Sequence, residues 1–413
     1  MATSITPEFY QKLVDRCWRR SGTLLYRPNQ KNSCCPHYTL RLDSTKFRPT
    51  KDQRQAINRF NKFVIGEEYS KELARTCPRS REEAQRRDNE FDLVSRIAEP
   101  ELSSLKTPPM PAHELAVTLE PDTFTEEKYS VFENYQRLVH HEPPEKISRV
   151  GFKRFLCNSP LSRGSLGGSD GSERQLGSFH QCYRLDGKLV AIGVLDLLPD
   201  CVSAVYFLYH ESIRSHNPGK LGALREIALA LKAGYRWWYS GFYIHSCPKM
   251  KYKVDYSPQY VLDPETLEWD LLDKEALAIF DTKPYVSLSR ERQPAAQSEG
   301  GGLIGSSAPK SVDSGPAAKT NDEKASRDSS FLFDSEMPGI PSLEEMNHVD
   351  MSHLLLASDY SDSYFLASQL VVWEKDSINE YGNIKSRIAE LVAAIGPDLM
   401  EDFVVDFRRR NQL

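Results

Sequence analysis

Several features that would define whole classes of protein are missing from this chain of 413 residues. No apolar run reaches the roughly 18 residues that a membrane-spanning helix needs. The first residues, Met-Ala-Thr-Ser-Ile, lack the basic and then apolar regions of a signal peptide. The eight cysteines do not show the spacing of a disulfide framework. We therefore expect a reduced, intracellular protein without a membrane partner, located in the cytoplasm, with the nucleus as the alternative.

Common catalytic loops are missing as well. The chain has no Gly-x-Ser-x-Gly nucleophile elbow, no Walker phosphate loop and no Gly-x-Gly-x-x-Gly dinucleotide fingerprint. It has no Cys-x-x-Cys either, so the adjacent Cys34 and Cys35 are the most compact pair of candidate metal ligands. Two thiolates fill only half of a tetrahedral metal site.

The net charge is small, but the charged residues are unevenly distributed along the chain. The whole chain carries a formal charge of −5, yet the segment from Lys12 to Lys62 holds 13 Lys and Arg against 3 Asp and Glu. A local excess of this size attracts polyanions whatever the total charge is. The sequence therefore predicts a basic N-terminal region that contacts the phosphates of a nucleic acid.

The most informative segment runs from Arg236 to Lys253. Its first half is rich in aromatic residues, which favour a strand, and its second half carries Lys249, Lys251 and Lys253 at intervals of two. In an extended chain these three lysines would share one face. Ammonium groups beside flat rings suit phosphates and unpaired bases, so we predict a site for the end of a single-stranded nucleic acid. Buried core and a solvated surface are the alternative explanations of the two halves.

Composition divides the chain into five segments. We expect a basic region with the cysteine pair at 1–66, a charged and partly disordered insert at 67–121, and a transferase core at 122–285. A low-complexity linker is expected at 286–361 and a C-terminal strand and helix, packing back on the body, at 362–413.

Local signals predict the elements of the core. Asp186-Gly187 between two apolar runs indicates a hairpin, Asn217-Pro218 opens a helix that ends at Gly234, and Thr123 with Glu126 predicts a capping box for an earlier helix. Further helices are expected around 10–18 and from Lys51 to Gly66, and a last strand at 369–373. The order indicates an α+β fold with a mixed, mostly antiparallel sheet flanked by helices.

The helix and strand order resembles that of the GNAT acyltransferases. Those enzymes cradle the pyrophosphate of coenzyme A with an Arg/Gln-x-x-Gly-x-Gly/Ala loop before the long helix. Here the corresponding segment, His216 to Gly222, does not fit that pattern. If the fold is of this kind, coenzyme A is not the expected donor.

Several longer motifs resemble those of the arginyl-tRNA–protein transferases. They lie in the order of that family, between positions 13 and 397: 13–49, Gly177–Tyr183, Val194–Pro199, Val202–Tyr206, Ala223–Ile227, Gly241–Lys253 and Glu380–Pro397. The inserts between them are similar to those of fungal members. The resemblance implies transfer of arginine from Arg-tRNA to the α-amine of proteins that begin with Asp, Glu or oxidised Cys, which marks them for degradation.

This activity agrees with the missing loops, because an aminoacyl ester is already activated and needs no ATP site. The acceptor amine has a reference pKa of about 7.7–8.0, so positioning and stabilisation of the oxyanion could carry most of the rate. Two other functions stay open. One is a GNAT-type N-acetyltransferase that uses acetyl-CoA, and the other is a noncatalytic regulator that binds tRNA. Nothing in the sequence indicates an oligomeric state.

The resemblance assigns candidate roles to three sets of residues. Candidates for the chemistry, including a carboxylate for the arginyl guanidinium, are His180, Gln181, Tyr183, Asp196 and Glu226. Candidates that bind the substrates are Arg225, Tyr206, Tyr243, His245, Lys249, Lys251 and Tyr252. Candidates for tRNA phosphates are Arg19, Arg20, Lys46, Arg48, Lys51, Arg54 and Lys253.

Cysteine usage departs from the family. Its members carry a Cys-x-x-Cys upstream of the Trp-Arg-Arg motif, which joins the adjacent cysteine pair in an iron–sulfur or haem-linked regulatory site. This chain is expected to begin too late to include that motif, and Cys17 stands where the family usually has glycine. Cys34 and Cys35 stay as the candidate metal ligands, an iron–sulfur cluster or haem is expected only in a full-length form that includes the upstream pair, and transfer is expected to require no cofactor.

Overall fold

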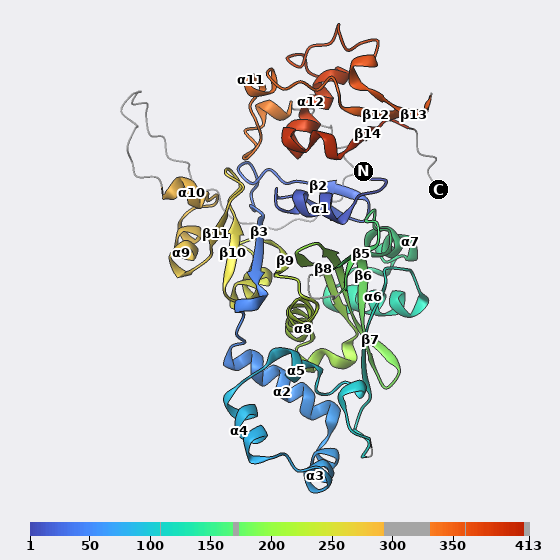
Figure 1. Ribbon diagram of the computed structural model, residues 1–413, viewed down its shortest axis with the longest axis vertical. Helices are drawn as coiled ribbons and strands as arrows, with labels where there is room; N and C mark the ends of the chain where they lie inside the picture. The colour runs from blue at the N-terminus through green and yellow to red at the C-terminus, as the bar shows by residue number, and fades with distance from the viewer. Residues whose placement is uncertain (108, 168–172, 293–330, 360, 409–413) are drawn as a thin grey trace, which may run out of the picture.

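The computed structural model describes residues 1–107, 109–167, 173–292, 331–359 and 361–408. One large sheet forms its centre (Figure 1). The strand order is β11-β10-β3-β9-β8-β7-β6-β4, and β5 pairs with β6 at one side. The bounds are β11 Trp269–Leu271, β10 Gln259–Leu262, β3 Tyr38–Asp43, β9 Trp237–Tyr243, β8 Cys201–Tyr209, β7 Lys188–Leu198, β6 Glu173–Leu185, β4 Leu115–Pro121 and β5 Gly164–Gly167.

Only one pair of neighbouring strands in this sheet is parallel. β8 and β9 run in the same direction, and every other pairing in the sheet is antiparallel. The predicted mixed, mostly antiparallel sheet flanked by helices is therefore confirmed. The parallel pair requires a crossover, and helix α8 (Pro218–Ala233) supplies it.

The expected hairpin joins β6 and β7. Asp186 and Gly187 both have positive φ, 52° and 76°, as a two-residue turn of this kind demands. The turn fixes the register, so that Leu185 pairs with Lys188. Because side chains alternate between faces, this register also decides which residues of the long hairpin face each layer of helices.

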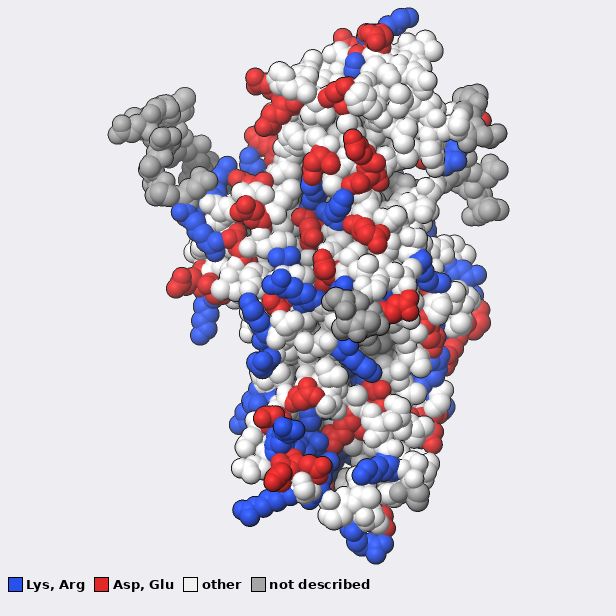
Figure 2. All heavy atoms as spheres, viewed as in Figure 1, with Lys and Arg blue, Asp and Glu red and all other residues white. Residues whose placement is uncertain are grey.

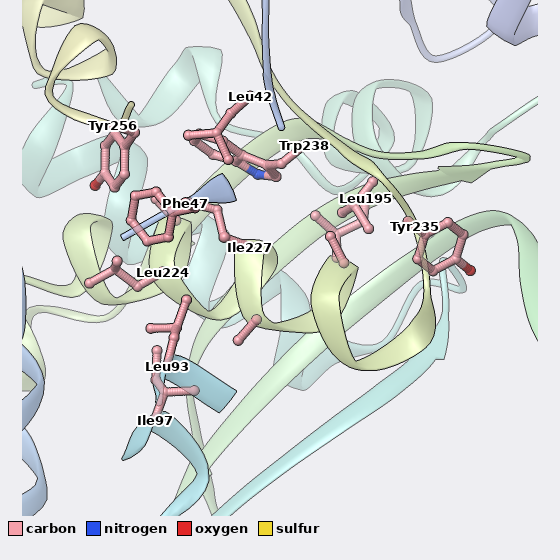
Figure 3. Close-up of a cluster of buried hydrophobic side chains, with 14 of the residues drawn as sticks. Leu42, Phe47, Leu93, Ile97, Leu195, Leu224, Ile227, Tyr235, Trp238 and Tyr256 are labelled. Atoms are coloured by element: carbon pink, nitrogen blue, oxygen red, sulfur yellow. The ribbon is translucent and has the colours of Figure 1, made fainter. Parts of the chain in front are cut away.

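Helices α8, α2 (Lys51–Ile65) and α5 (Leu93–Ala98) cover one face of the sheet (Figure 3). Their apolar side chains enclose Trp238 of β9 and Leu195 of β7. Both predicted helices have the expected ends, because Thr50 caps α2 and Gly234, with φ of 78°, closes α8.

The opposite face is covered by α1 (Pro7–Val14), α6 (Glu126–Val139) and α7 (Arg149–Phe152), which continues into a π-turn at Lys153–Cys157. The predicted helix start at Thr123 is wrong, because Thr125 caps α6 and accepts a hydrogen bond from the Lys128 amide. The threonine closest to the helix has the geometry that a capping residue needs. A short hairpin, β1 (Arg19–Ser21) and β2 (Leu24–Tyr26), follows α1.

The segment 67–121 was expected to be partly disordered, and within the described residues it is instead helical. It forms α3 (Glu67–Thr76), α4 (Arg81–Asn89), α5, a 3₁₀ turn at Leu102–Ser104 and then β4. A few buried side chains, among them Tyr69, Leu93 and Ile97, hold it against α2 and α8. Because these apolar positions are sparse within a strongly charged sequence, composition alone conceals them.

The remaining described residues form a unit at the C-terminal end (Figure 1). It contains α11 (Leu343–Met346), a small sheet of β12 (Leu355–Ser358), β13 (Ser361–Leu366) and β14 (Val404–Asp406), and α12 (Ile384–Ile395). The expected strand at 369–373 is wrong, because a 3₁₀ turn at Ala367–Gln369 and further turns occupy that region. Residues 331–358 of the expected linker are ordered, and 293–330 lie outside the described residues.

The C-terminal unit packs on the N-terminal region. Trp18 donates a hydrogen bond to the Ala394 carbonyl, at 3.1 Å, and Arg16 pairs with Asp398 at 2.6 Å. Apolar residues of α1 and of the 3₁₀ turn Pro397–Asp402 share one cluster. Helices α9 (Lys274–Thr282) and α10 (Leu288–Glu291) come before this unit in the sequence and pack against β3 and β10. Within the described residues, no helix is both long and apolar enough to cross a bilayer.

Candidate functional site

The parallel strands β8 and β9 separate after a short common stretch. They pair only from Cys201 to Ser203, against Trp237 to Tyr239, and β8 carries a register shift just beyond this point. The backbone of β9 past Tyr239 is therefore left without a strand on that side. A side chain takes the strand's place, because the Lys253 Nζ donates to the Ser240 and Phe242 carbonyls at 2.6 and 2.7 Å. We call this opening the strand splay.

Lys253 comes from a 3₁₀ helix, η6 (Pro248–Asp255), that follows β9. Burial lowers the pKa of the Lys253 ammonium to about 8, and the neighbouring Arg19 guanidinium adds to this effect. The ammonium therefore satisfies buried carbonyls and lies close to losing its proton at neutral pH.

Glu226 of α8 lies beneath the splay and is 2% exposed. The Trp238 indole donates to its carboxylate at 2.8 Å. Burial raises the pKa of Glu226 to about 7, although the Trp238 hydrogen bond and the Lys253 charge both act to lower it. A carboxyl group with this pKa can accept and release a proton near neutrality.

Further polar groups accompany Glu226 between α8 and the sheet. A Cβ at Gly193 would meet the Glu226 carboxylate at 3.4 Å, so the glycine leaves space there. Gln181 lies beside the same position, and the Tyr183 hydroxyl donates to its side-chain oxygen at 2.5 Å. Burial raises the pKa of Tyr183, which stays a neutral donor. Three of the predicted catalytic residues, Gln181, Tyr183 and Glu226, are thus brought together.

Asp196 lies on the other face of the sheet and already has a cation. Arg20 binds it with two hydrogen bonds, of 2.6 and 2.8 Å, and both side chains are buried. The Ser178 hydroxyl accepts a third hydrogen bond from Arg20. This geometry corrects two expectations, because Asp196 faces Arg20 instead of an open site for an arginyl group, and Arg20 is not on the surface where tRNA phosphates could reach it.

Two other predicted site residues, Arg225 and His180, also bind groups within the fold. Arg225 forms an ion pair with Glu101, at 2.5 Å, and donates to the Ile97 carbonyl, so it holds α5 on α8. His180 is fully buried with Nε2 3.0 Å from the Leu156 carbonyl, and burial lowers its pKa to about 4. Its contacts are those of a neutral core histidine on the face of the sheet opposite Gln181.

The three lysines of the opening motif do not share a face. Pro248 starts a 3₁₀ helix instead of continuing the strand, so the interval of two no longer aligns the side chains. Lys253 points into the splay, while Lys249 and Lys251 are exposed. Lys251 lines a hollow of about 480 Å³ together with Cys34 and His245, and the Lys249 charge helps burial to lower the pKa of His140.

The predicted substrate-binding tyrosines occupy three places around η6. The Tyr206 hydroxyl lies 3.0 Å from His140 Nε2, and Tyr243 lies 2.7 Å from His245, whose other nitrogen reaches Asp281 at 2.8 Å. Tyr252 is half exposed.

A larger hollow lies beside η6, where α8 begins. Its volume is about 670 Å³, and its wall combines the rings of Tyr209, Tyr252 and Tyr256 with two cations and two carboxylates: Arg214, Lys220, Asp52 and Asp255. Lys220 and Asp52 form an ion pair. The first turn of α2 and the N-terminus of α8 complete it. We call it the tyrosine cavity. Of its residues the sequence motifs indicated only Tyr252, although Asn217-Pro218 marked the helix start that shapes it.

The candidates for tRNA phosphates divide into buried and exposed groups. Arg19 is 7% exposed, stacks over Phe242 at 5.1 Å, and keeps Nε and Nη2 without hydrogen-bond partners. Lys46, Arg48, Lys51 and Arg54 are exposed along the entry to α2. Figure 2 shows basic and acidic side chains interspersed over the face in view, so the basic N-terminal sequence does not form one uniformly basic surface there.

The cysteine pair does not form a metal centre by itself. The sulfur atoms of Cys34 and Cys35 lie 3.7 Å apart, and the hydrogen bond from Cys34 raises the pKa of Cys35. Within the described ranges, no group of three His, Cys, Asp or Glu side chains is arranged to hold a metal ion. In this part of the chain the cysteine pair therefore offers two thiolates, half of a tetrahedral set.

Two family models match this chain. The model described as "Arginine-tRNA-protein transferase, N terminus" matches residues 1–55, and "Arginine-tRNA-protein transferase, C terminus" matches residues 127–263. The first match contains Arg19 and Arg20, and the second contains Asp196, Glu226 and Lys253. Arg19 of the first match lies over Phe242 and beside Lys253 of the second, so the two matched segments meet at the strand splay, and the Arg20–Asp196 pair joins them on the other face of the sheet.

Individual proteins give a consistent picture. The chain is 33% identical to arginyl-tRNA–protein transferase 1 of Saccharomyces cerevisiae over 62% of its own length, and spans about half (48%) of that protein. It is 28% identical to the Drosophila melanogaster protein of the same name, over 70% of the chain and 80% of the relative. An aspartate/glutamate leucyltransferase of Pseudomonas fluorescens is 28% identical, over 60% and 77%.

A solved structure, the C-terminal domain of a putative lysylphosphatidylglycerol synthetase from Agrobacterium fabrum, has a TM-score of 0.28 and 12% identity, covering 60% of this chain and 64% of that one. This likeness is too weak to assign the fold.

Proposed function

Because the chain belongs to the arginyl-tRNA–protein transferase family, we propose that it transfers arginine from Arg-tRNA to the α-amine of an acceptor protein. The observation that carries this proposal is the convergence of both matched segments on one splay, which contains a partly buried lysine and a buried carboxyl group. The proposal includes a core of the GNAT type, for which the splayed parallel pair β8–β9 and the crossover helix α8 are the supporting features.

The reaction requires little from the protein beyond positioning and proton transfer. The neutral α-amine attacks the ester carbonyl carbon, a C–N bond forms, and the C–O bond to the ribose of the tRNA breaks. The amine loses a proton, and the ribose oxygen gains one. Glu226 is our candidate for holding that proton or for binding the arginyl guanidinium, because its pKa of about 7 suits either protonation state. Transfer by this route uses no cofactor.

The tyrosine cavity is our candidate for the 3′ end of the tRNA. The rings of Tyr209 and Tyr252 offer stacking surfaces for unpaired bases, while Tyr256 is buried behind them in the core. Arg214 is a donor for a phosphate, and Lys220 is a second one if the phosphate displaces Asp52 from its ion pair. The exposed Lys46, Arg48, Lys51 and Arg54 add cations along the entry to α2.

Acceptors with Asp, Glu or oxidised Cys at the N-terminus are the finer part of the proposal. The Pseudomonas relative is named for aspartate and glutamate. An acidic side chain needs a cation with free donors, and Arg19 keeps Nε and Nη2 unpaired while it lies near Lys253. Arg225, the sequence-based candidate for this task, is already paired with Glu101. As reactant and product are intracellular in this reaction, the proposed location is the cytoplasm, with the nucleus as the alternative.

The test uses Arg-tRNA carrying labelled arginine and peptides that differ only in the first residue. We expect label on a peptide that begins with Asp and none on its Ala counterpart. A Glu226→Gln variant is expected to lose most of the rate while it still binds tRNA, and Glu275→Gln, an exposed carboxyl group on α9, serves as the matched control. Binding of tRNA without labelled peptide would leave the noncatalytic regulator, and acetylation with acetyl-CoA would leave the acetyltransferase.

A further inference from the structure

A second large hollow lies about one helix length away from the tyrosine cavity. Helices α2, α3, α4 and α5 and the turn before β4 enclose a space of about 710 Å³. Its wall includes the basic residues Lys62, Arg79, Arg87, Arg96 and Lys106, and Glu99 is its one acidic residue. None of these residues belongs to the strand splay or to the tyrosine cavity. We call this hollow the arginine bowl.

Three guanidinium groups in the bowl face a single carboxylate. Arg87 lies 2.7 Å, Arg96 3.4 Å and Arg79 3.5 Å from Glu99 oxygens. One carboxylate cannot neutralise three cations, and Lys106 adds another charge to the wall. Cations held this close together repel one another unless an anion joins them. The bowl therefore carries a surplus of positive charge.

Unused donors point to the same conclusion. Arg96 is mostly buried, with 14% of its side chain exposed; its Nε has no hydrogen-bond partner, and its Nη1 has only the ion pair with Glu99 at 3.4 Å. Its Nη2 donates to the Asn58 side chain at 2.6 Å, which fixes the guanidinium against the wall. Buried polar groups are normally satisfied, so unpaired donors in a hollow indicate a missing acceptor.

We propose that the arginine bowl binds a backbone phosphate of the tRNA, as a second anchor beyond the acceptor end. This inference rests on the proposed function, because it takes Arg-tRNA as the polyanion. Helix α2 connects the two hollows: Gln53 in its first turn lines the tyrosine cavity, and Asn61 and Ile65 line the bowl. At 1.5 Å per residue the two positions are about 15 Å apart along the helix.

A phosphate suits the bowl better than the carboxylate of an acidic protein. Guanidinium groups bind phosphate oxygens with paired hydrogen bonds, and a phosphodiester bridges several cations at once. The exposed Lys51 and Arg54 on α2 lead from one hollow toward the other, so a continuous backbone would meet cations along the way. Apolar neighbours, such as Leu73 and Leu105, limit the water that would screen these charges.

The experiment compares Arg79→Gln/Arg87→Gln with a matched control, Arg75→Gln/Arg81→Gln. The control residues are exposed on α3 and α4 and do not line the bowl, whereas Arg79 lies between these helices and Arg87 lies on α4. The Kd for uncharged tRNA is measured between 50 and 300 mM KCl, and labelled arginine transfer is measured at saturating Arg-tRNA. We expect binding to weaken roughly 5- to 20-fold, with the slope of log K against log salt reduced by about 1, and the saturated rate to stay within about twofold.

A second variant is expected to change the tRNA affinity in the opposite direction. Glu99→Gln removes the carboxylate, so we expect tRNA to bind about two- to fivefold more tightly at low salt, and cooperative melting of each variant checks its fold.

Unchanged tRNA affinity and salt slope in the bowl variant, relative to the control, would overturn the inference. If the bowl variant raises the KM for an acidic acceptor protein and leaves the tRNA affinity unchanged, the inference is also overturned. The bowl would then bind the acceptor protein instead of the tRNA. Absence of arginine transfer in the unaltered chain would contradict the proposed function alone, since the tRNA affinities would still be measured.

Discussion

Most arginines before position 46 and the basic residues from position 46 to 54 occupy opposite environments. Arg20 is buried on Asp196, Arg41 is held between the rings of Trp237 and Trp269 at 3.8 and 4.0 Å, and Arg27 donates to carbonyls of the C-terminal unit. Lys46, Arg48, Lys51 and Arg54 are exposed. A basic sequence is therefore not the same as a basic surface, and most of the first group builds the fold that presents the second.

The largest effect is expected from breaking the buried pair. Arg20→Ala leaves the Asp196 carboxylate buried without a cation, so we expect it to lower the free energy of unfolding by about 3–5 kcal/mol. Denaturant titration measures this loss. Lys12→Ala, which breaks an exposed pair with Asp402 in the same part of the chain, is the control. Equal losses for the two variants would contradict the division into buried and exposed groups.

The next largest effect concerns the pH dependence of Glu226. Its pKa of about 7 in the folded protein exceeds the ordinary 4.5, so between these values the folded state holds a proton that the unfolded state has lost. Stability must therefore fall as pH rises from about 4.5 to 7. We expect Glu226→Gln to remove this decline and to gain on the order of 3 kcal/mol at pH 8. A melting series from pH 5 to 8 checks this, and parallel profiles for the variant and the unaltered chain would show that Glu226 does not titrate in this way.

Replacing Lys253 tests the splay directly. Lys253→Met keeps much of the side-chain volume but leaves the Ser240 and Phe242 carbonyls without their donor, for an expected loss of about 2 kcal/mol. Arginine transfer is expected to fall more than tenfold because the splay loses its cation. The exposed Lys251→Met is the control for stability. A variant as stable as this control would mean that the two carbonyls find other partners.

The exposed group should matter for binding and not for folding. Lys46→Gln/Lys51→Gln/Arg54→Gln is expected to change the free energy of unfolding by less than about 0.5 kcal/mol and to weaken tRNA binding several-fold with a smaller salt slope. Lys146→Gln/Lys188→Gln/Lys274→Gln, which changes three exposed lysines elsewhere, is the matched control. If both triple variants bind tRNA equally well, the entry to α2 does not contact it.

The smallest effect is expected at the contact with the C-terminal unit. Arg16 pairs with Asp398, whose side chain is 64% exposed. Surface pairs of this kind contribute about 0–1 kcal/mol, so Arg16→Ala should shift the unfolding midpoint only slightly, and less at high salt. A loss as large as that of Arg20→Ala would place the C-terminal contact among the main determinants of stability.

Local signals in the sequence predicted much of the core. Asp186-Gly187 fixed the hairpin, and Asn217-Pro218 with Gly234 bounded α8, because a turn or a helix end depends on a few adjacent residues. The Gly241 to Lys253 motif drew attention to the segment that supplies Lys253 to the splay. Its face could not be predicted, since the interval of two assumed a strand and the backbone turns into a 3₁₀ helix at Pro248.

Partners that are distant in the sequence were beyond prediction. Arg20 and Asp196 are separated by 176 positions, and neither carries a local sign of the other. The tyrosine cavity and the arginine bowl each combine several elements, so their residues are spread over the sequence without a motif. The helices of 67–121 were missed because their few buried side chains are hidden among charged ones.

The most direct test locates the 3′ end of the tRNA on the protein. A tRNA that carries a photoreactive adenosine at its 3′ terminus is cross-linked to the chain, and the attached peptide is identified by mass spectrometry. We predict attachment at Tyr209 or Tyr252, around the tyrosine cavity and beside the strand splay. Attachment confined to the C-terminal unit, or to the exposed surface of α9, would contradict the assignment of the site.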